Sequence, residues 1–235
     1  MKKRRVLLKL SGESLCAPGG SGIDVEVARG VALQIQRGLT ANELELALIV
    51  GGGNLLRGAQ ISGTGIDRVT GDTMGMLATV INALALKAVL ESAGVPTRVL
   101  SPVATGEGVD PFSCQLCDVH LEAGRTVILA GGTGNPYFTT DTTAVLRSLQ
   151  IGADVVCKGT KVRGIYSEDP ETNPEAEFYE RVSFKDAIQR GLRVMDVTAF
   201  SLCQDNELPI RVFNVRERGN IERVLRGEEI GTLVE

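Results

Sequence analysis

Short apolar runs rich in valine, isoleucine and leucine recur along the chain, and each has the length of a buried strand. They lie at residues 6–8, 44–50, 95–100, 126–130, 153–157 and 210–213. Between them, apolar positions recur every three or four residues, as in helices with one buried face. This alternation predicts an α/β fold with a mostly parallel central sheet sandwiched between helices on both faces.

The longest helical pattern covers residues 72–93. Its apolar residues between Met76 and Val89 recur at spacings of three and four, and Gly94 follows as a stop signal. Capping residues predict shorter helices elsewhere, because Ser, Thr and Asp side chains accept hydrogen bonds from the first backbone N–H groups of a helix. These helices are expected from about residue 140 to 149, from residue 183 onward, at 196–205 and at 220–226.

Length and composition favour one large α/β domain. The chain has 235 residues, of which 43% are hydrophobic, enough to bury a sizeable core. A boundary between two lobes is expected near residue 150. The net charge of −4 provides no basic surface for a nucleic-acid partner.

Neither a membrane span nor an export signal is expected, so the expected location is the cytoplasm. Lys9 ends the first apolar run too early for a secretory signal, and glycines and charged residues interrupt every longer apolar block. Five cysteines, an odd number, favour reduced thiols over a disulfide framework. Cys114, Cys117 and His120 would offer three metal ligands, but no second Cys/His pair completes a site, and we interpret them as part of an amphipathic helix.

Three of the predicted strands end in glycine-rich turns, which are Lys9-Leu-Ser-Gly12, Gly51-Gly-Gly-Asn54 and Gly131-Gly-Thr-Gly-Asn-Pro136. The carboxyl ends of parallel strands share one edge of a sheet, and glycine lets backbone N–H groups approach an anion there. One such turn alone is equally consistent with a plain structural role. Three turns with nearby cations predict a site for a polyphosphate or for two phosphorylated ligands. The cations are Lys9, Arg57, Lys158 and Lys161.

Signatures of other nucleotide and hydrolase sites are missing from the sequence. No G-x-x-x-x-G-K-[ST] or G-x-S-x-G motif occurs, which excludes a P-loop and a serine nucleophile elbow. The turn at Gly132 lacks the third glycine of a dinucleotide fingerprint. His120 is the only histidine, which argues against a histidine general base. Phosphoryl transfer fits this inventory, since it needs mainly alignment and charge neutralisation.

Five sequence blocks run from the first predicted strand to the last, at residues 9–13, 51–58, 71–79, 132–141 and 208–214. Their combination resembles the bacterial UMP kinases, a family with the amino acid kinase fold. The resemblance implies transfer of the γ-phosphoryl group of ATP to UMP in pyrimidine nucleotide biosynthesis. It also implies an acceptor-binding part at about residues 1–150 and an ATP-binding part at about 151–235.

The resemblance implies residue roles as well. The implied catalytic residues are Lys9, Arg57, Asp141, Lys158 and Asp196. The two aspartates would organise Mg²⁺ and nearby lysines, and capping preference leaves a helix N-cap as the alternative for each. The implied ATP-binding residues are Lys9, Leu10, Ser11, Gly12, Gly53, Arg57, Thr160, Tyr166 and Asp169. The implied UMP-binding residues are Gly52, Asp72, Thr133, Gly134, Asn135, Pro136, Tyr137, Phe138, Thr139 and Thr140, with Asp72 suited to the ribose hydroxyls.

The implied cofactor is Mg²⁺, bound mainly through nucleotide phosphates, and the implied assembly is a homohexamer with UTP and GTP as effectors. Residues 17–22 lack the acidic and aromatic side chains expected in the loop associated with GTP control, and Arg163 stands where the family has aspartate. Two alternatives stay open. One is a kinase of the same fold that acts on a carboxylate or carbamate, and the other is a nucleotide-sensing protein without turnover.

Overall fold

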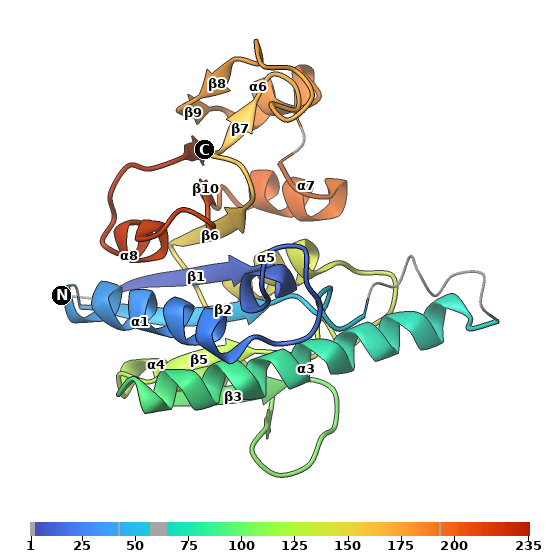
Figure 1. Ribbon diagram of the computed structural model, residues 1–235, viewed down its shortest axis with the longest axis vertical. Helices are drawn as coiled ribbons and strands as arrows, with labels where there is room; N and C mark the ends of the chain where they lie inside the picture. The colour runs from blue at the N-terminus through green and yellow to red at the C-terminus, as the bar shows by residue number, and fades with distance from the viewer. Residues whose placement is uncertain (1–2, 42, 57–64, 193) are drawn as a thin grey trace.

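A computed structural model describes residues 3–41, 43–56, 65–192 and 194–235. Within these ranges nine strands form one twisted sheet (Figure 1). All neighbouring strands are parallel except the pair β10 and β11. In spatial order the strands are β4 (Asp110–Pro111), β3 (Thr97–Ser101), β5 (Thr126–Leu129), β2 (Leu44–Val50), β1 (Arg4–Leu10), β6 (Val155–Thr160), β10 (Ile210–Asn214), β11 (Thr232–Val234) and β9 (Arg181–Val182). A small antiparallel hairpin of β7 (Ile165–Tyr166) and β8 (Phe178–Tyr179) stands apart.

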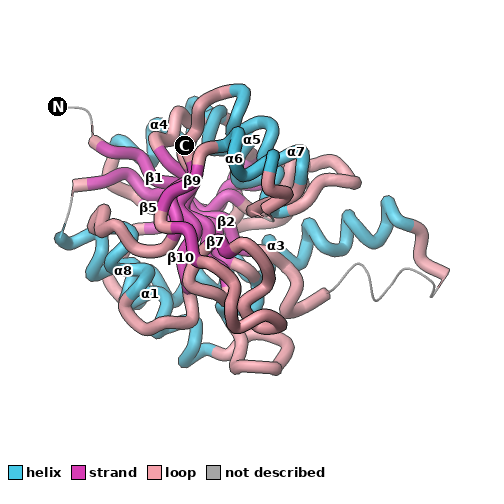
Figure 2. Tube along the Cα trace, turned by 90° about the horizontal axis from the view of Figure 1, so that it is seen from above, coloured by secondary structure: helices cyan, strands magenta, loops and turns pink. Residues whose placement is uncertain are grey.

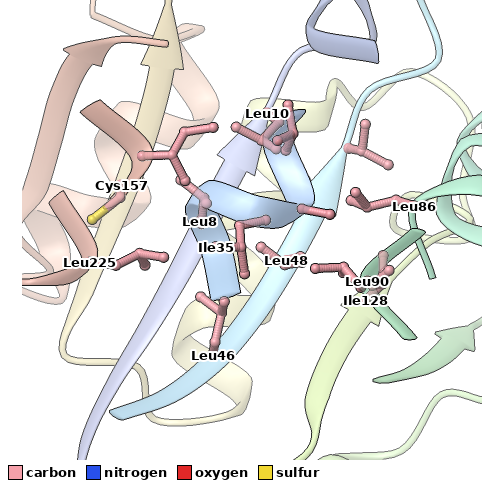
Figure 3. Close-up of a cluster of buried hydrophobic side chains, with 14 of the residues drawn as sticks. Leu8, Leu10, Ile35, Leu46, Leu48, Leu86, Leu90, Ile128, Cys157 and Leu225 are labelled. Carbon is pink, nitrogen blue, oxygen red and sulfur yellow. The ribbon is translucent and has the colours of Figure 1, made fainter. Parts of the chain in front are cut away.

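Helices cover both faces of the sheet, so the predicted fold class is confirmed (Figure 2). One face is covered by α1 (Val25–Ala41), α3 (Arg68–Ser92) and α8 (Asn220–Leu225). The other is covered by α4 (Cys114–Glu122), α5 (Thr140–Gln150), α6 (Phe184–Gln189) and α7 (Val197–Asp205). Side chains alternate between the two faces along each strand, which produces two separate hydrophobic clusters. Leu8, Leu48 and Leu86 lie in the first of these (Figure 3).

All six predicted strands are present, with shifts at their ends. β1 begins at Arg4, although arginine is an unusual residue inside a sheet. Arg5 is only 7% exposed, and its guanidinium binds Glu45 at 2.7 Å and Asp118 at 2.6 Å, so its charge is paired. β6 continues past the predicted end to Thr160, because its pairing with β10 reaches Thr160 opposite Asn214.

Helix α1 is absent from the expected elements although its signal is present in the sequence. Ala28, Val31, Ala32 and Ile35 recur at helical spacing and are all buried. Asp24 precedes the helix and accepts hydrogen bonds from the backbone N–H groups of residues 26 and 27. The apolar stripe therefore carries α1 onto the sheet between α3 and α8.

The expected start of α3 at Asp72 is wrong by one turn. The helix begins at Arg68, and Asp67 is its N-cap, accepting a hydrogen bond from the Thr70 N–H at 3.0 Å. Gly71 resembles a helix boundary in the sequence but lies inside the first turns, where the Asp67 cap outweighs the low helix propensity of glycine. Asp72 thus projects from within the helix.

By length and composition alone, α3 is apolar enough to cross a membrane, contrary to the expectation that no stretch of the chain approaches this. The helix contacts α1 and β3, and Ala83, Leu86 and Leu90 are completely buried against the sheet. We interpret α3 as a core helix of a globular fold, since such helices pass the same test.

Candidate active site

The three glycine turns lie at one edge of the sheet, as the sequence predicts. They follow β1, β2 and β5, which are adjacent and parallel. The first two turns are in close contact, because the Gly51 N–H donates to the Leu10 carbonyl at 3.0 Å. A Cβ atom at Gly12 would lie 2.7 Å from the Gly51 carbonyl oxygen, so only glycine permits this approach.

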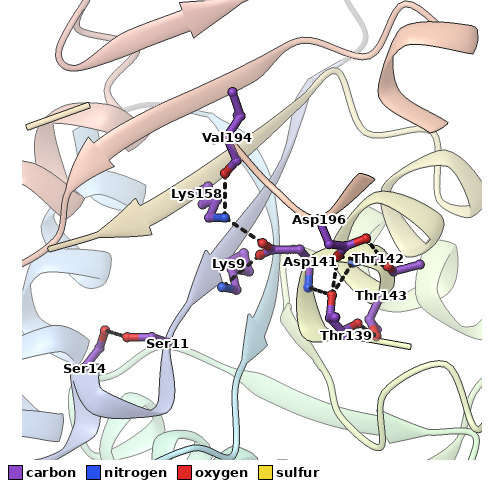
Figure 4. A network of polar contacts seen from close by, with 10 residues as sticks. All are labelled: Lys9, Ser11, Ser14, Thr139, Asp141, Thr142, Thr143, Lys158, Val194 and Asp196. Carbon is purple, nitrogen blue, oxygen red and sulfur yellow. Dashed lines mark hydrogen bonds and ion pairs between the residues drawn. The ribbon is translucent and has the colours of Figure 1, made fainter. Parts of the chain in front are cut away.

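Two lysines share one carboxylate beside these turns (Figure 4). Lys9 of β1 places its Nζ atom 3.0 Å from Asp141 Oδ1, and Lys158 of β6 places its Nζ atom 2.6 Å from Asp141 Oδ2. The three side chains are between 12% and 15% exposed. The Lys158 ammonium also donates to the Val194 carbonyl at 2.7 Å. We call Lys9, Asp141 and Lys158 the lysine–aspartate cluster.

Burial and the neighbouring charges shift the pKa values of Asp141 and Lys158 in this cluster. Burial acts to raise the pKa of Asp141, but the charges of Lys9 and Lys158 outweigh it and lower that pKa below its ordinary value of 3.8. Burial, with the neighbouring Lys9 charge, lowers the pKa of Lys158 below its ordinary value of 10.5. At neutral pH Asp141 is therefore an ionised carboxylate that binds protons poorly, which makes it unsuitable as a general base.

Asp196 links α7 to α5. Its Oδ1 atom caps α7 by accepting from the Ala199 N–H at 3.0 Å, so the N-cap alternative is confirmed for this residue. Its carboxylate also accepts hydrogen bonds from the hydroxyls of Thr139 and Thr142 (Figure 4). For Asp141 the N-cap alternative is wrong, because Thr139 caps α5 and leaves the Asp141 carboxylate for the lysines.

The remaining predicted ATP-binding residues fall into two groups. Lys9, Ser11, Gly12 and Gly53 lie at the turns, where a Cβ atom at Gly53 would meet nothing within 4 Å, so this glycine faces open space. Leu10 is completely buried and offers only its backbone to a ligand. Arg57 lies outside the described residues.

Thr160 ends β6, and its hydroxyl donates to the Val162 carbonyl at 2.8 Å. Tyr166 and Asp169 belong to the hairpin region instead. The Tyr166 ring packs on Phe178 with 5.3 Å between centroids, and Asp169 Oδ1 accepts from the Glu171 N–H at 2.9 Å. Both of these contacts lie within the hairpin and the loop that connects its two strands.

The predicted UMP-binding residues gather around Asp72 and the turn after β5. Gly52 packs against α3, where its Cβ atom would lie 2.9 Å from the Ala78 Cβ atom. Asp72 Oδ2 accepts from the Tyr137 N–H at 2.7 Å and from Arg68 Nε at 2.8 Å. Tyr137 has a left-handed backbone with φ of 71°. The Asp72 carboxylate therefore stabilises the bend at Tyr137.

The rest of this loop presents backbone and small polar groups to its surroundings. Gly131, Gly132 and Gly134 all have positive φ values, which glycine adopts without strain. The Thr133 hydroxyl and the backbone of Asn135 bind each other at 3.1 Å. Beyond Pro136, the side chains of Tyr137 and Phe138 are 64% and 51% exposed. Thr139 and Thr140 then begin α5 and bring the loop to the lysine–aspartate cluster.

Three residues that the sequence did not single out also hold these turns. Thr79 of α3 accepts from the Gly131 N–H at 2.8 Å, and Asn82, one turn further on, donates to the Gly51 carbonyl at 2.7 Å. Arg147 of α5 is 4% exposed and donates to the Gly132 and Thr133 carbonyls. For Thr79 and Asn82 the signal in the sequence is a polar residue on a mostly apolar helix face, which indicates a buried polar group but not its partner. Arg147 has no such signal, because its neighbours on the buried face of α5 include threonine and serine.

The cysteine and histidine residues of α4 form no metal site. Cys117 is buried, and burial raises the pKa of its thiol to about 12. His120 Nδ1 lies 2.9 Å from Arg125 Nη1. Across the described ranges, no group of three or more His, Cys, Asp or Glu side chains is arranged to hold a metal ion. The five cysteines, all described, carry free thiols.

Comparison with known proteins identifies relatives over nearly the whole chain. The sequence model of the amino acid kinase family matches residues 4–214. The chain is 49% identical over 231 residues to a uridylate kinase of Methylococcus capsulatus, covering 98% of this chain and 96% of the relative. Its structure is similar to UMP kinase from Bacillus anthracis, with a TM-score of 0.94, 34% identity, and coverage of 99% of this chain and 96% of the other. UMP kinase from Ureaplasma parvum superposes with a TM-score of 0.93 at 36% identity, with full coverage of both chains.

Proposed function

The chain belongs to the amino acid kinase family, and we propose that it transfers the γ-phosphoryl group of ATP to UMP, giving ADP and UDP, in pyrimidine nucleotide biosynthesis. The observation that carries the proposal is the lysine–aspartate cluster on the adjacent strands β1 and β6, at the sheet edge where the glycine turns lie. This arrangement can align two phosphates and neutralise the charge between them.

On the donor side, Lys9 and the N–H groups of residues 11, 12 and 53 would bind the ATP phosphates. Positive charge and fixed dipoles there stabilise the transferring group more than the ground state, because negative charge redistributes over its oxygens in the transition state. Lys158, on the neighbouring strand, would bind one of the same oxygens. Thr160, Tyr166 and Asp169 would hold the adenosine, and Arg57 would add a further cation.

On the acceptor side, Asp72 and residues 133–140 would hold UMP, with Gly52 lying beneath. A nucleoside monophosphate is already mostly dianionic at neutral pH, so its attacking oxygen needs no general base. This agrees with the low pKa of Asp141 and with the position of the single histidine on α4. A hydroxyl acceptor, by contrast, would have to lose a proton and would need a general base.

Asp141 would hold both lysine ammonium groups at the separation that the phosphates require. Asp196 would act one step further away, by fixing Thr139 and Thr142 at the start of the helix that carries Asp141. We therefore place Asp141 in the catalytic cluster and assign Asp196 the role of a positioning residue.

Mg²⁺ would enter with ATP and be held mainly by its phosphates, as is usual for this ion. Asp141 Oδ1 is a buried carboxylate oxygen of the site that is paired with Lys9 at 3.0 Å, so Asp141 would organise the ion through the lysines that bind the phosphates. The ion would neutralise phosphate charge, while the chain binds and orients both nucleotides.

A coupled assay for ADP release tests the proposal. Purified protein with Mg-ATP is given UMP, CMP, acetylglutamate, aspartate or carbamate in turn. ADP release that depends on UMP is expected. Turnover with only an acyl acceptor would instead identify a carboxylate or carbamate kinase, and saturable nucleotide binding without ADP would identify a sensor.

The larger-scale properties implied by the resemblance stay predictions. We propose a homohexamer, an acceptor-binding part at about residues 1–150, an ATP-binding part at about 151–235, a cytoplasmic location, and UTP and GTP as effectors. Light scattering tests the assembly by measuring whether the particle has six times the mass of the chain. Titrating each effector into the assay tests regulation.

A further inference from the structure

Asparagine side chains connect α3 to the turn after β2. Asn82 is completely buried on α3, and Asn54, which is 4% exposed, ends the turn. The two amides face each other and bind reciprocally. Asn82 Nδ2 donates to Asn54 Oδ1 at 2.6 Å, and Asn54 Nδ2 donates to Asn82 Oδ1 at 3.1 Å.

Each amide uses its second N–H on a backbone carbonyl. Asn82 donates to the Gly51 carbonyl at 2.7 Å, and Asn54 donates to the Gly22 carbonyl at 2.7 Å. The Asn54 carbonyl in turn accepts from the Gly22 N–H at 2.8 Å. All four side-chain N–H groups are therefore used, and the pair ties α3, the turn after β2 and the loop after β1 together.

This asparagine pair, Asn54 and Asn82, borders the phosphate-binding turns directly. A Cβ atom at Gly12 would lie 3.0 Å from the Asn54 backbone nitrogen and would overlap its side-chain oxygen. Gly12 is therefore in close contact with the Gly51 carbonyl and the Asn54 side chain, the two groups that Asn82 binds. Removing the Asn82 amide would leave the Gly51 carbonyl and Asn54 Oδ1 without this buried donor, while Asn54 Nδ2 would keep its bond to the Gly22 carbonyl.

We propose that Asn82 is a positioning residue for phosphoryl transfer, which acts through Gly51 and Asn54 to set the backbone N–H groups of the two turns against the ATP phosphates. This rests on the proposed kinase function. Asn82 does not touch the nucleotide itself, since it is enclosed beneath the turn. Its loss should therefore disturb the binding of phosphates without disturbing the binding of adenosine.

The test compares Asn82→Ala with Leu90→Ala, a matched control. Leu90 is completely buried on the same helix two turns further along (Figure 3) and belongs to the hydrophobic core. Both variants remove a buried side chain and should lower the unfolding midpoint. Only Asn82→Ala should lower kcat, by about 10- to 100-fold, because small misplacements of positioning groups cost this much.

Binding gives the second readout. In Asn82→Ala the Kd of ATP should rise about tenfold while that of adenosine changes less than about twofold, whereas Leu90→Ala should leave both within about twofold. The two amides act as one unit, so losing both should cost little more than losing one. The kcat of the Asn54→Ala/Asn82→Ala double variant should lie within about twofold of the kcat of the slower single variant. If Asn82→Ala does not fold, Asn54→Ala replaces it in the comparison with Leu90→Ala, because Asn54 is the partner of Asn82 in the turn after β2.

The inference is overturned if Asn82→Ala and Leu90→Ala behave alike in kcat and in both binding constants, since Asn82 would then contribute only stability. Failure of the kinase proposal would give a different result, because the unmodified protein would then release no ADP with UMP. In that case the contrast between ATP and adenosine binding still decides whether Asn82 positions the turns.

Discussion

The lysine–aspartate cluster and an arginine-rich pocket near α8 and β11 are both dense in charge, but they hold it in different ways. In the cluster, two cations from different strands share one carboxylate, and no side chain is more than 15% exposed. The pocket, of about 320 Å³, is lined by arginines and glutamates that pair at the surface. Arg181 and Glu229 lie 3.8 Å apart with 59% and 80% exposed side chains, for example.

The difference is one of solvent access. Water and salt can replace the partner of an exposed charge, so an exposed ion pair contributes little. A buried charge that loses its partner has no such replacement. Positions in the cluster should therefore affect rate and stability strongly, and positions in the pocket weakly.

The largest expected effect is on rate. Lys9→Met should lower kcat by about 100- to 1,000-fold, as the loss of one preorganised electrostatic group typically does. Arg181→Met, which also removes one cation, should leave kcat within about twofold because Arg181 is exposed. The coupled assay measures both, and circular dichroism checks that each variant is folded. An unchanged kcat in Lys9→Met would remove this lysine from the mechanism.

The second effect is on stability. Asp141→Asn should lower the free energy of unfolding by about 3 kcal/mol at pH 7, because both lysines lose their buried partner. Since the folded-state pKa of Asp141 is depressed, its stabilising contribution is fully present above pH 3.8 and is lost as the pH falls through the depressed value.

Urea unfolding at several pH values measures the difference between Asp141→Asn and the unmodified protein. That difference should be constant from pH 7 to about pH 4 and shrink below it. A difference that instead vanished between pH 7 and pH 5 would show that the carboxylate is not held by the lysines.

Asp72 is intermediate in exposure between the lysine–aspartate cluster and the arginine-rich pocket. Its side chain is 19% exposed and is paired with the Arg68 side chain, which is 62% exposed. Asp72→Asn should raise the KM for UMP about tenfold and leave the KM for ATP unchanged, as expected for the loss of one charged hydrogen-bond acceptor. Asp67→Asn is the matched control, because it removes a carboxylate from the same helix end while asparagine keeps the cap. A change confined to the ATP dependence would place Asp72 on the donor side.

The smallest effect is expected at the surface. Glu228→Gln breaks the 2.7 Å ion pair between Glu228 and Arg223. The Arg223 side chain is 46% exposed and the Glu228 side chain is 42% exposed. The free energy of unfolding should change by less than about 1 kcal/mol, and less still in high salt. A larger loss in the urea unfolding curve would mean that the contrast between the two charged regions is wrong.

Local features of the sequence predicted much of the fold and part of the site. Six strands and the glycine turns could be predicted, because buried strands appear as apolar runs and unusual backbone conformations appear as glycines. Lys9 and Lys158 were identified as nearby cations, and their shared contact with Asp141 follows from the pairing of β1 with β6. Helix α1 also has a local signal, the apolar stripe from Ala28 to Ile35.

Features that depend on distant partners were not readable. Asn82 and Thr79 bind turns that lie 31 and 52 residues away in the chain, and Arg147 binds carbonyls of a loop that precedes its own helix. A polar residue in an apolar pattern shows that a partner must exist but not which one. The start of α3 was misplaced for a different reason, because the Asp67 cap is a local signal, three residues before Thr70, that resembles an ordinary loop aspartate.

The bond from Lys158 to the Val194 carbonyl limits what this lysine can offer a ligand. An ammonium group has three N–H donors, and Asp141 and Val194 take two of them. One proton is left, and its direction is set by the two bonds already made. Lys158 can therefore engage a single phosphate oxygen along one line, so that a lysine, normally a freely rotating point charge, becomes a directional contact.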